Sequence, residues 1–110
     1  MSLFDVEIAD GALGPVIVLS GEIDLAAAEV LDERIRAGLD AQASTVVVDL
    51  REVEFMDSSG LRLVLRLDHD VRERAGRLVV VRGGRRVARV MELTGADRQL
   101  ETVDDPAEIQ

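Results

Sequence analysis

The chain has 110 residues, of which 47% are hydrophobic and 32% are charged, a size and composition typical of one domain with its own core. Its formal net charge is −9, so nucleic acid and anionic membrane surfaces should repel it, and we expect neither as a partner. It contains no cysteine, which excludes disulfides, a thiolate nucleophile and a zinc finger.

The amino-terminal stretch "MSLFDVEIAD" has no basic region before an apolar core and no small-residue cleavage site. No later segment approaches 18 consecutive apolar residues, the length that indicates a membrane span. We therefore expect a cytoplasmic protein made of a single domain, residues 1–110, with a polar tail from about residue 104.

The first quarter of the chain predicts two strands and a turn. "LFDVEIAD" alternates apolar and polar residues, a turn follows at residues 11–15, and "VIVLSGEI" predicts a second strand, so the two strands should form a hairpin. A helix should then run from Leu25 to about Leu39, with Asp24 as its N-cap. Its apolar residues recur at four-residue spacing: Ala27, Leu31, Ile35 and Leu39.

The rest of the chain alternates strands and helices. "TVVVDL" at residues 45–50 predicts a central strand covered on both faces, after which "REVEFM" should leave the sheet and a helix should run from Ser59 to about Ala75. "RLVVVR" predicts another buried strand, "GGRRVARVMELTG" a shorter helix closed by Gly95, and "QLETVD" an edge strand. This order predicts an α/β fold in which right-handed crossovers join parallel strands.

The stretch "DSSG" at residues 57–60 is placed where α/β proteins present their sites, between the carboxyl end of a central strand and a helix. Asp57 and Ser58 have an ordinary structural role open to them there, since short polar side chains cap the free N–H groups of a helix start. The alternative is that an exposed serine at this place has a function of its own.

A serine hydrolase is the enzyme class to test first, and the sequence argues against it. The turn is not Gly-x-Ser-x-Gly, and the only candidate base, His69, lies about ten residues along the same helix and hence roughly 15 Å away. No EF-hand loop, phosphate loop or cysteine–histidine cluster occurs. We expect no enzyme activity, no metal and no cofactor.

Two further features have a structural and a functional interpretation each. The apolar residues of the second helix span an arc of about 200°, so one flank packs against a neighbouring helix, or Leu61 or Leu63 belongs to a protein-binding surface. A local group of arginines forms either a solvated face or a phosphate-binding patch: Arg82, Arg85, Arg86 and Arg89.

Three segments in order, "SGEIDLAAAE", "VVVDLREVEFMDSSGLRLVL" and "GGRRVARVMELTGAD", closely resemble the STAS domain family of bacterial anti-sigma factor antagonists. The resemblance runs from near residue 1 to about residue 103. Its specific motif is "FMDSSGL" after a "VxxDL" strand. It implies a mostly parallel sheet of four or five strands with an N-terminal hairpin and with helices packed on one side.

The resemblance also implies a function. Family members bind an anti-sigma factor that is a serine kinase, release the sigma factor, and are inactivated when the kinase phosphorylates the first serine of the turn, here Ser58. A metal-dependent serine phosphatase restores them. We expect the following residues at the partner-binding surface: Asp24, Asp57, Ser58, Ser59, Gly60, Leu61 and Leu63.

Physical chemistry agrees with such a switch, because a phosphate would add about −1.5 to −2 charges beside Asp57 while the helix start tolerates an anion. The alternative within the family is a STAS scaffold or docking subunit of a stress-sensing or transporter complex, with no serine switch. Ser58, the length of the chain and the lack of membrane segments favour the first interpretation. The short tail "DDPAEIQ" differs from the final helix of many relatives.

Overall fold

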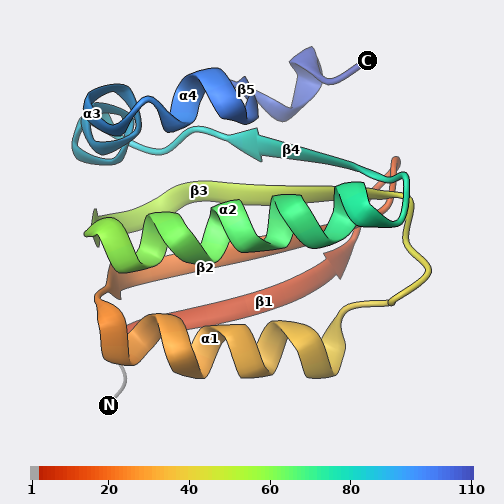
Figure 1. Ribbon diagram of the computed structural model, residues 1–110, viewed down its shortest axis with the longest axis horizontal. Helices are drawn as coiled ribbons and strands as arrows, with labels where there is room; N and C mark the ends of the chain where they lie inside the picture. Colours follow the sequence, from red (N-terminus) through yellow and green to blue (C-terminus); the bar gives the residue numbers. More distant parts are fainter. Residues whose placement is uncertain (1–2) are drawn as a thin grey trace.

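The computed structural model describes residues 3–110, and within them one five-stranded sheet forms the centre of the molecule (Figure 1). The strands are β1 (Phe4–Asp10), β2 (Pro15–Ile23), β3 (Thr45–Met56), β4 (Arg77–Val81) and β5 (Glu101–Val103).

The strands lie in the order β1-β2-β3-β4-β5. β1 pairs with β2 antiparallel through the predicted hairpin, and all later pairs are parallel. The predicted central place of the strand that begins at Thr45 and the edge place of β5 are both confirmed. Parallel pairing brings the carboxyl ends of β2 and β3 to the same edge of the sheet.

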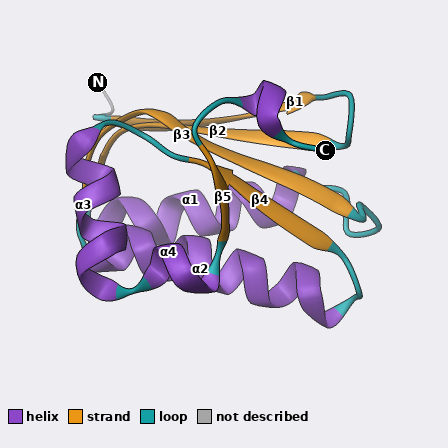
Figure 2. Cartoon of the chain, turned by 90° about the horizontal axis from the view of Figure 1, so that it is seen from above, coloured by secondary structure: helices purple, strands orange, loops and turns teal. Residues whose placement is uncertain are grey.

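Helices join the parallel strands and lie on one side of the sheet (Figure 2). They are α1 (Leu25–Gly38), α2 (Ser58–Glu73), α3 (Arg85–Thr94) and α4 (Ala96–Gln99), and a short 3₁₀ helix, η1 (Pro106–Glu108), follows β5. The predicted apolar stripe of α1 is buried at Ala27, Leu31 and Ile35. Gly95 ends α3 in the left-handed conformation, with a φ of 78°, as the sequence predicts.

The core lies between the sheet and α1 and α2, which run side by side (Figure 1). Inward-facing side chains alternate along β2 and β3, with Ile17 and Leu19 on one strand and Val46, Val48 and Leu50 on the other, all fully buried. Aliphatic residues fill this core, as the shortage of aromatic residues requires. Neither this layer nor any other part of residues 3–110 has a helix with the length and hydropathy needed to cross a membrane.

Strand β3 is longer than predicted. The sequence indicates that "REVEFM" leaves the sheet, but β3 continues to Met56 because β2 keeps pairing with it as far as Ile23–Met56. β4 stops pairing with β3 at Asp49–Val81, so the second half of β3 projects beyond β4, and α3 packs against β3. The extension brings the turn at Asp57 to the carboxyl end of β2.

The added length of β3 is matched by irregular pairing in β2 near Gly21. Gly21 has a φ of 86°, and a Cβ atom there would lie 1.9 Å from the carbonyl oxygen of Leu3. Only glycine fits this close approach of β1 to a bulged strand.

The opposite face of the sheet is covered in part by the carboxyl-terminal segment, since η1 lies on that side (Figure 2). Val79 and Val81 are fully buried although they point away from the helix layer. Asp105 and Glu108 close η1 with a reciprocal capping box. The segment predicted as a polar tail therefore includes an ordered turn against the sheet.

Candidate functional site

Two helix starts lie next to each other at the carboxyl edge of the sheet. Ile23 and Met56 are paired at the ends of β2 and β3, and the backbone N–H of Asp57 donates to the carbonyl oxygen of Ile23 at 3.3 Å. Each strand is followed immediately by the aspartate that begins the next helix, Asp24 before α1 and Asp57 before α2. The chain thereby brings together two segments separated by about thirty residues.

Both aspartates cap their helices with the side chain. Asp24 accepts a hydrogen bond from the N–H of Ala27 at 2.9 Å, and Asp57 accepts one from the N–H of Ser59 at 2.8 Å. Both cap residues have an extended backbone. The predicted N-cap roles are confirmed for Asp24 and Asp57.

Ser58 occupies the first position of α2 and is exposed to solvent. Asp57 supplies the cap, and within residues 3–110 the Ser58 hydroxyl has no hydrogen-bond partner. The suggestion that Ser58 has a capping role is therefore wrong, because Asp57 already satisfies the helix start. The helix begins at Ser58, one residue earlier than predicted.

The next residues of the turn face inward to different extents. Ser59 is half-buried, whereas Gly60 and Leu61 are buried, Leu61 with 4% of its surface exposed. A Cβ atom on Gly60 would lie 2.4 Å from Cγ of Met56 and 3.0 Å from Cγ2 of Ile23. Gly60 and Leu61 seat the first turn of α2 on the core, and the contact with a partner that the sequence predicts for them stays a prediction.

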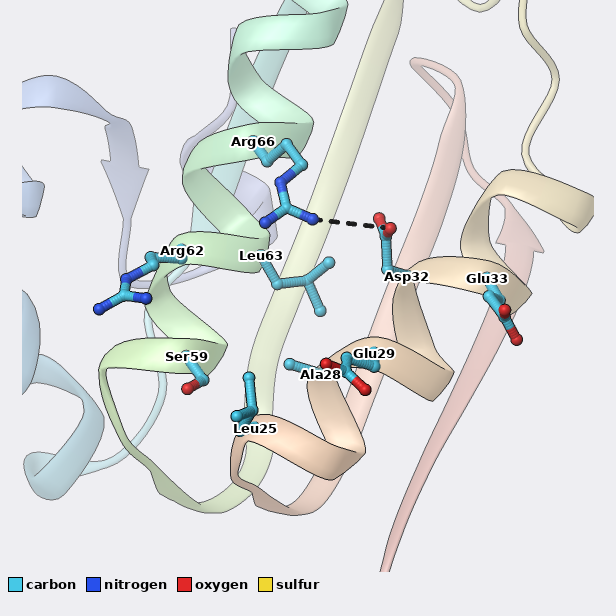
Figure 3. A pocket seen from close by; sticks show the side chains of 9 residues that line it. All are labelled: Leu25, Ala28, Glu29, Asp32, Glu33, Ser59, Arg62, Leu63 and Arg66. Atoms are coloured by element: carbon cyan, nitrogen blue, oxygen red, sulfur yellow. Dashed lines mark ion pairs between the residues drawn. The ribbon is translucent and has the colours of Figure 1, made fainter.

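A groove of about 400 Å³ runs between α1 and α2 beside this turn (Figure 3). Acidic side chains of α1 form one wall and arginines of α2 the other, and Arg66 Nη1 lies 3.7 Å from Asp32 Oδ2 across it. Leu63, only 2% exposed, contributes to the apolar floor. The lining residues are Leu25, Ala28, Glu29, Asp32, Glu33, Ser59, Arg62, Leu63 and Arg66.

The broad apolar arc of α2 has the structural explanation that the sequence left open. Leu63, Val64, Leu67 and Val71 are buried, and α2 packs against both the sheet and α1. A wide apolar face is needed because two neighbours cover it. Of the two residues suggested for a protein-binding surface, only Leu63 lines the groove, and only 2% of its surface is exposed.

Two exposed apolar residues near the turn were missed by the sequence reasoning. Leu25, the first residue of α1, is 60% exposed and lines the groove, and Phe55, at the end of β3, is 43% exposed. Leu25 precedes the buried stripe that begins at Ala27, which is the signal that could have found it, since the first turn of this helix extends past the core. Solvent-exposed apolar groups beside a polar turn are typical of protein-binding surfaces.

The other candidate chemistry lies elsewhere. His69 is exposed, with Nε2 3.3 Å from Oε1 of Glu73 on the outer side of α2, eleven residues after Ser58. Of the predicted arginine patch, Arg82 is paired with Asp104 at 2.8 Å, and the three arginines of α3 are exposed. Residues 3–110 contain no cluster of three side chains suited to hold a metal ion.

The fold and these two helix starts define a small α/β domain with a mostly parallel sheet and an N-terminal hairpin. The family model for the STAS domain matches residues 4–109. This chain belongs to the STAS domain family.

Two of the proteins similar to this chain are named as antagonists of anti-sigma factors, and a third is known in a phosphorylated form. The anti-sigma-F factor antagonist RsfB of Mycobacterium tuberculosis is 32% identical over 102 residues, which cover 91% of this chain and 84% of RsfB. The crystal structure of an anti-sigma factor antagonist from Mycobacterium paratuberculosis aligns with a TM-score of 0.81 and 28% identity over 96% of this chain and 89% of that one. The Bacillus cell fate determinant SpoIIAA, in its phosphorylated form, aligns with a TM-score of 0.67 and 26% identity over 94% of each chain.

Proposed function

We propose that this protein is an anti-sigma factor antagonist that binds an anti-sigma factor serine kinase, releases a sigma factor, and is switched off by phosphorylation of Ser58. The family, together with relatives named as antagonists of anti-sigma factors, supports the first part. A Bacillus relative whose structure is that of a phosphorylated form supports the second.

The observation that supports the switch is that Asp57 caps α2 while Ser58, the next residue, is exposed. Asp57 satisfies the start of α2, so the exposed Ser58 hydroxyl contributes nothing that the fold requires. A kinase can reach it, and a phosphate placed there stands at a helix start, where backbone N–H groups and the helix dipole tolerate an anion. Modification therefore changes the surface without unfolding the domain.

The effect on binding follows from charge and bulk at the centre of the surface. The phosphate adds about −1.5 to −2 charges next to Asp57, at the end of the sheet where Asp24 begins the neighbouring helix. A partner that packs over the serine loses a contact and meets an anion. A loss of about 2 to 4 kcal/mol weakens the complex by roughly 30-fold to nearly 1000-fold.

The direct test is to mix the purified protein with ATP and an anti-sigma factor serine kinase from the same organism, and to map the modification by mass spectrometry. Ser58 should gain one phosphate, and the complex should weaken. Ser59→Ala should still be modified and Ser58→Ala should not, which assigns the site to one of two adjacent hydroxyls. A serine phosphatase should then restore binding. Modification of Ser59 instead, or binding that is equally strong before and after modification, would contradict the proposal.

The alternative is a STAS scaffold that uses the same surface without a switch. Its signature is recovery of a sensor or transporter subunit with this protein while Ser58 stays unmodified in the presence of ATP and the kinase. Substitution of Ser58 by alanine or aspartate would then leave that complex unchanged, which separates the two functions.

A further inference from the structure

Arg62 is the one arginine of α2 without an ion pair among the described residues. On the same helix, Arg66 approaches Asp32 of α1, and Arg72 pairs with Asp68 at 3.1 Å. Within residues 3–110, Arg62 makes neither an ion pair nor a side-chain hydrogen bond, although it is exposed and lines the groove. In a chain of net charge −9, an unpaired arginine on a helix whose two other arginines are paired calls for an explanation.

The spacing of Arg62 from Ser58 supplies one. The two residues are four positions apart on α2, and side chains at this spacing lie on one face with their Cβ atoms about 5–6 Å apart. Both side chains are exposed, so neither has to leave the core to meet the other. Figure 3 shows Arg62 extending from the outer edge of α2, on the turn that follows Ser59.

We propose that Arg62 binds the phosphate of phosphorylated Ser58. The inference rests on the proposed function, because it requires that Ser58 be modified. A guanidinium group donates two parallel N–H groups to phosphate oxygens, a geometry that an ammonium group cannot match. The pair forms within one helix turn, so no change of fold is needed.

The consequence is a phosphate that a neighbouring arginine holds in one position on the surface. Before modification, Arg62 extends from the outer edge of α2, away from the acidic side chains of α1 (Figure 3). After modification, the phosphate holds the guanidinium near Ser58, so an anion appears at the helix start and a flexible arginine becomes ordered beside it. A partner that packs over the turn therefore meets both the anion and the arginine that is held against it.

Other charged groups act on the same phosphate, so each variant that is compared replaces a single arginine and keeps the remaining groups. Asp24 and Asp57 oppose the anion from the two caps, and Glu29 and Glu33 oppose it from α1. The positive groups are Arg66 on the next turn of α2 and, from α3 at the same end of the sheet, Arg85, Arg86 and Arg89.

The test installs phosphoserine at position 58 by genetic code expansion and follows its ³¹P resonance as a function of pH. The unsubstituted protein and the variants Arg62→Gln and Arg66→Gln are compared at the same ionic strength, with circular dichroism as the check of fold. Arg66 is the matched control because it lies one turn farther along α2 and is already close to Asp32. Loss of Arg62 should raise the second pKa of the phosphate, with a roughly threefold smaller acid dissociation constant.

The Arg66→Gln variant should shift the titration midpoint much less than Arg62→Gln does, because Arg66 lies one turn farther from Ser58 and is already close to Asp32. The Nε–Hε resonance of Arg62 should move with the phosphate titration. An unchanged midpoint in Arg62→Gln, or an equal change in Arg66→Gln, would overturn the proposal. This experiment needs no kinase. If the kinase fails to modify Ser58, the proposed function fails, while the titration still answers whether Arg62 binds a phosphate at that position.

Discussion

The starts of α1 and α2 are built alike and end up different. Asp24 and Asp57 have nearly the same backbone angles, with φ values of −100° and −95°, and each accepts a hydrogen bond from its own helix. The next residue of α1 is the exposed, apolar Leu25, whereas that of α2 is the exposed, polar Ser58.

The comparison shows that the capping aspartates stabilise the two helix starts, whereas the residues that follow them determine the chemistry of the surface. The caps and the backbone bond from Asp57 to Ile23 fix the two helix starts relative to each other. Leu25 and Ser58, the first residues of the two helices, are exposed and do not cap them. One position has an exposed apolar side chain, and the other has an exposed hydroxyl group.

The strongest way to break the comparison is to place a carboxylate at either first position. Ser58→Asp should weaken binding to the anti-sigma kinase by about 30-fold or more, because the anion stands where the partner packs. Leu25→Asp should weaken it as well, by loss of apolar contact and addition of charge. Isothermal titration calorimetry measures both. An acidic residue suits the first turn of a helix, so circular dichroism should be unchanged. If Leu25→Asp bound the kinase as tightly as the unsubstituted protein, the start of α1 would not belong to the partner-binding surface.

The seat of α2 on the core can be tested at Gly60. Gly60→Ala should lower the free energy of unfolding by about 1–3 kcal/mol, because the added methyl group meets Met56 and Ile23 in a filled core. Urea denaturation gives this value. Gly84→Ala is the matched control: a Cβ atom there meets nothing within 4 Å, and the cost should stay within about 1 kcal/mol. Equal losses in the two variants would contradict the packing described for the first turn.

The equivalence of the two caps predicts similar losses. Asp24→Ala and Asp57→Ala should each reduce the free energy of unfolding by about 0.5–2 kcal/mol, since each removes one capping hydrogen bond. Asn in place of either Asp should recover most of the loss, because its carbonyl oxygen also accepts. A cap whose removal costs nothing in urea denaturation would show that its helix start does not depend on the aspartate.

The smallest effect is expected on acidification, at a carboxylate remote from both caps. Burial alone would raise the pKa of Asp49, but hydrogen bonds from Arg51, the shortest at 2.8 Å, outweigh it and hold that pKa below its ordinary value. The unfolded chain therefore takes up this proton first, at a pH of about 4, and stability falls as the pH drops below that point. Asp49→Asn should flatten this fall in urea titrations. An unchanged slope would exclude Asp49 as a contributor.

Most of the fold follows from the sequence because its signals are local. The period of the apolar residues in α1, the glycine at the end of α3 and the β-branched run in β3 each identify an element without knowledge of its neighbours. The length of β3 does not follow in this way. Glu52 and Glu54 break the apolar pattern, and only pairing with β2 keeps this segment in the sheet.

The candidate site was predictable in part. The spacing and residue types mark Asp57 and Ser58 as the start of a helix, but which oxygen caps and which stays free depends on side-chain geometry. The burial of Leu61 and the exposure of Leu25 depend on which neighbours cover each helix, so single-helix periodicity predicted neither. The adjacency of Asp24 and Asp57 is a property of parallel strand order.

The most direct measurement is the affinity of the anti-sigma kinase for the protein carrying phosphoserine at position 58, compared with the unmodified protein at the same ionic strength. We expect at least about 30-fold weaker binding of the phosphorylated form, with superimposable far-ultraviolet circular dichroism spectra. Equal affinities, or a phosphorylated form that has lost its fold, would contradict the account of Ser58 as a switch on an intact surface.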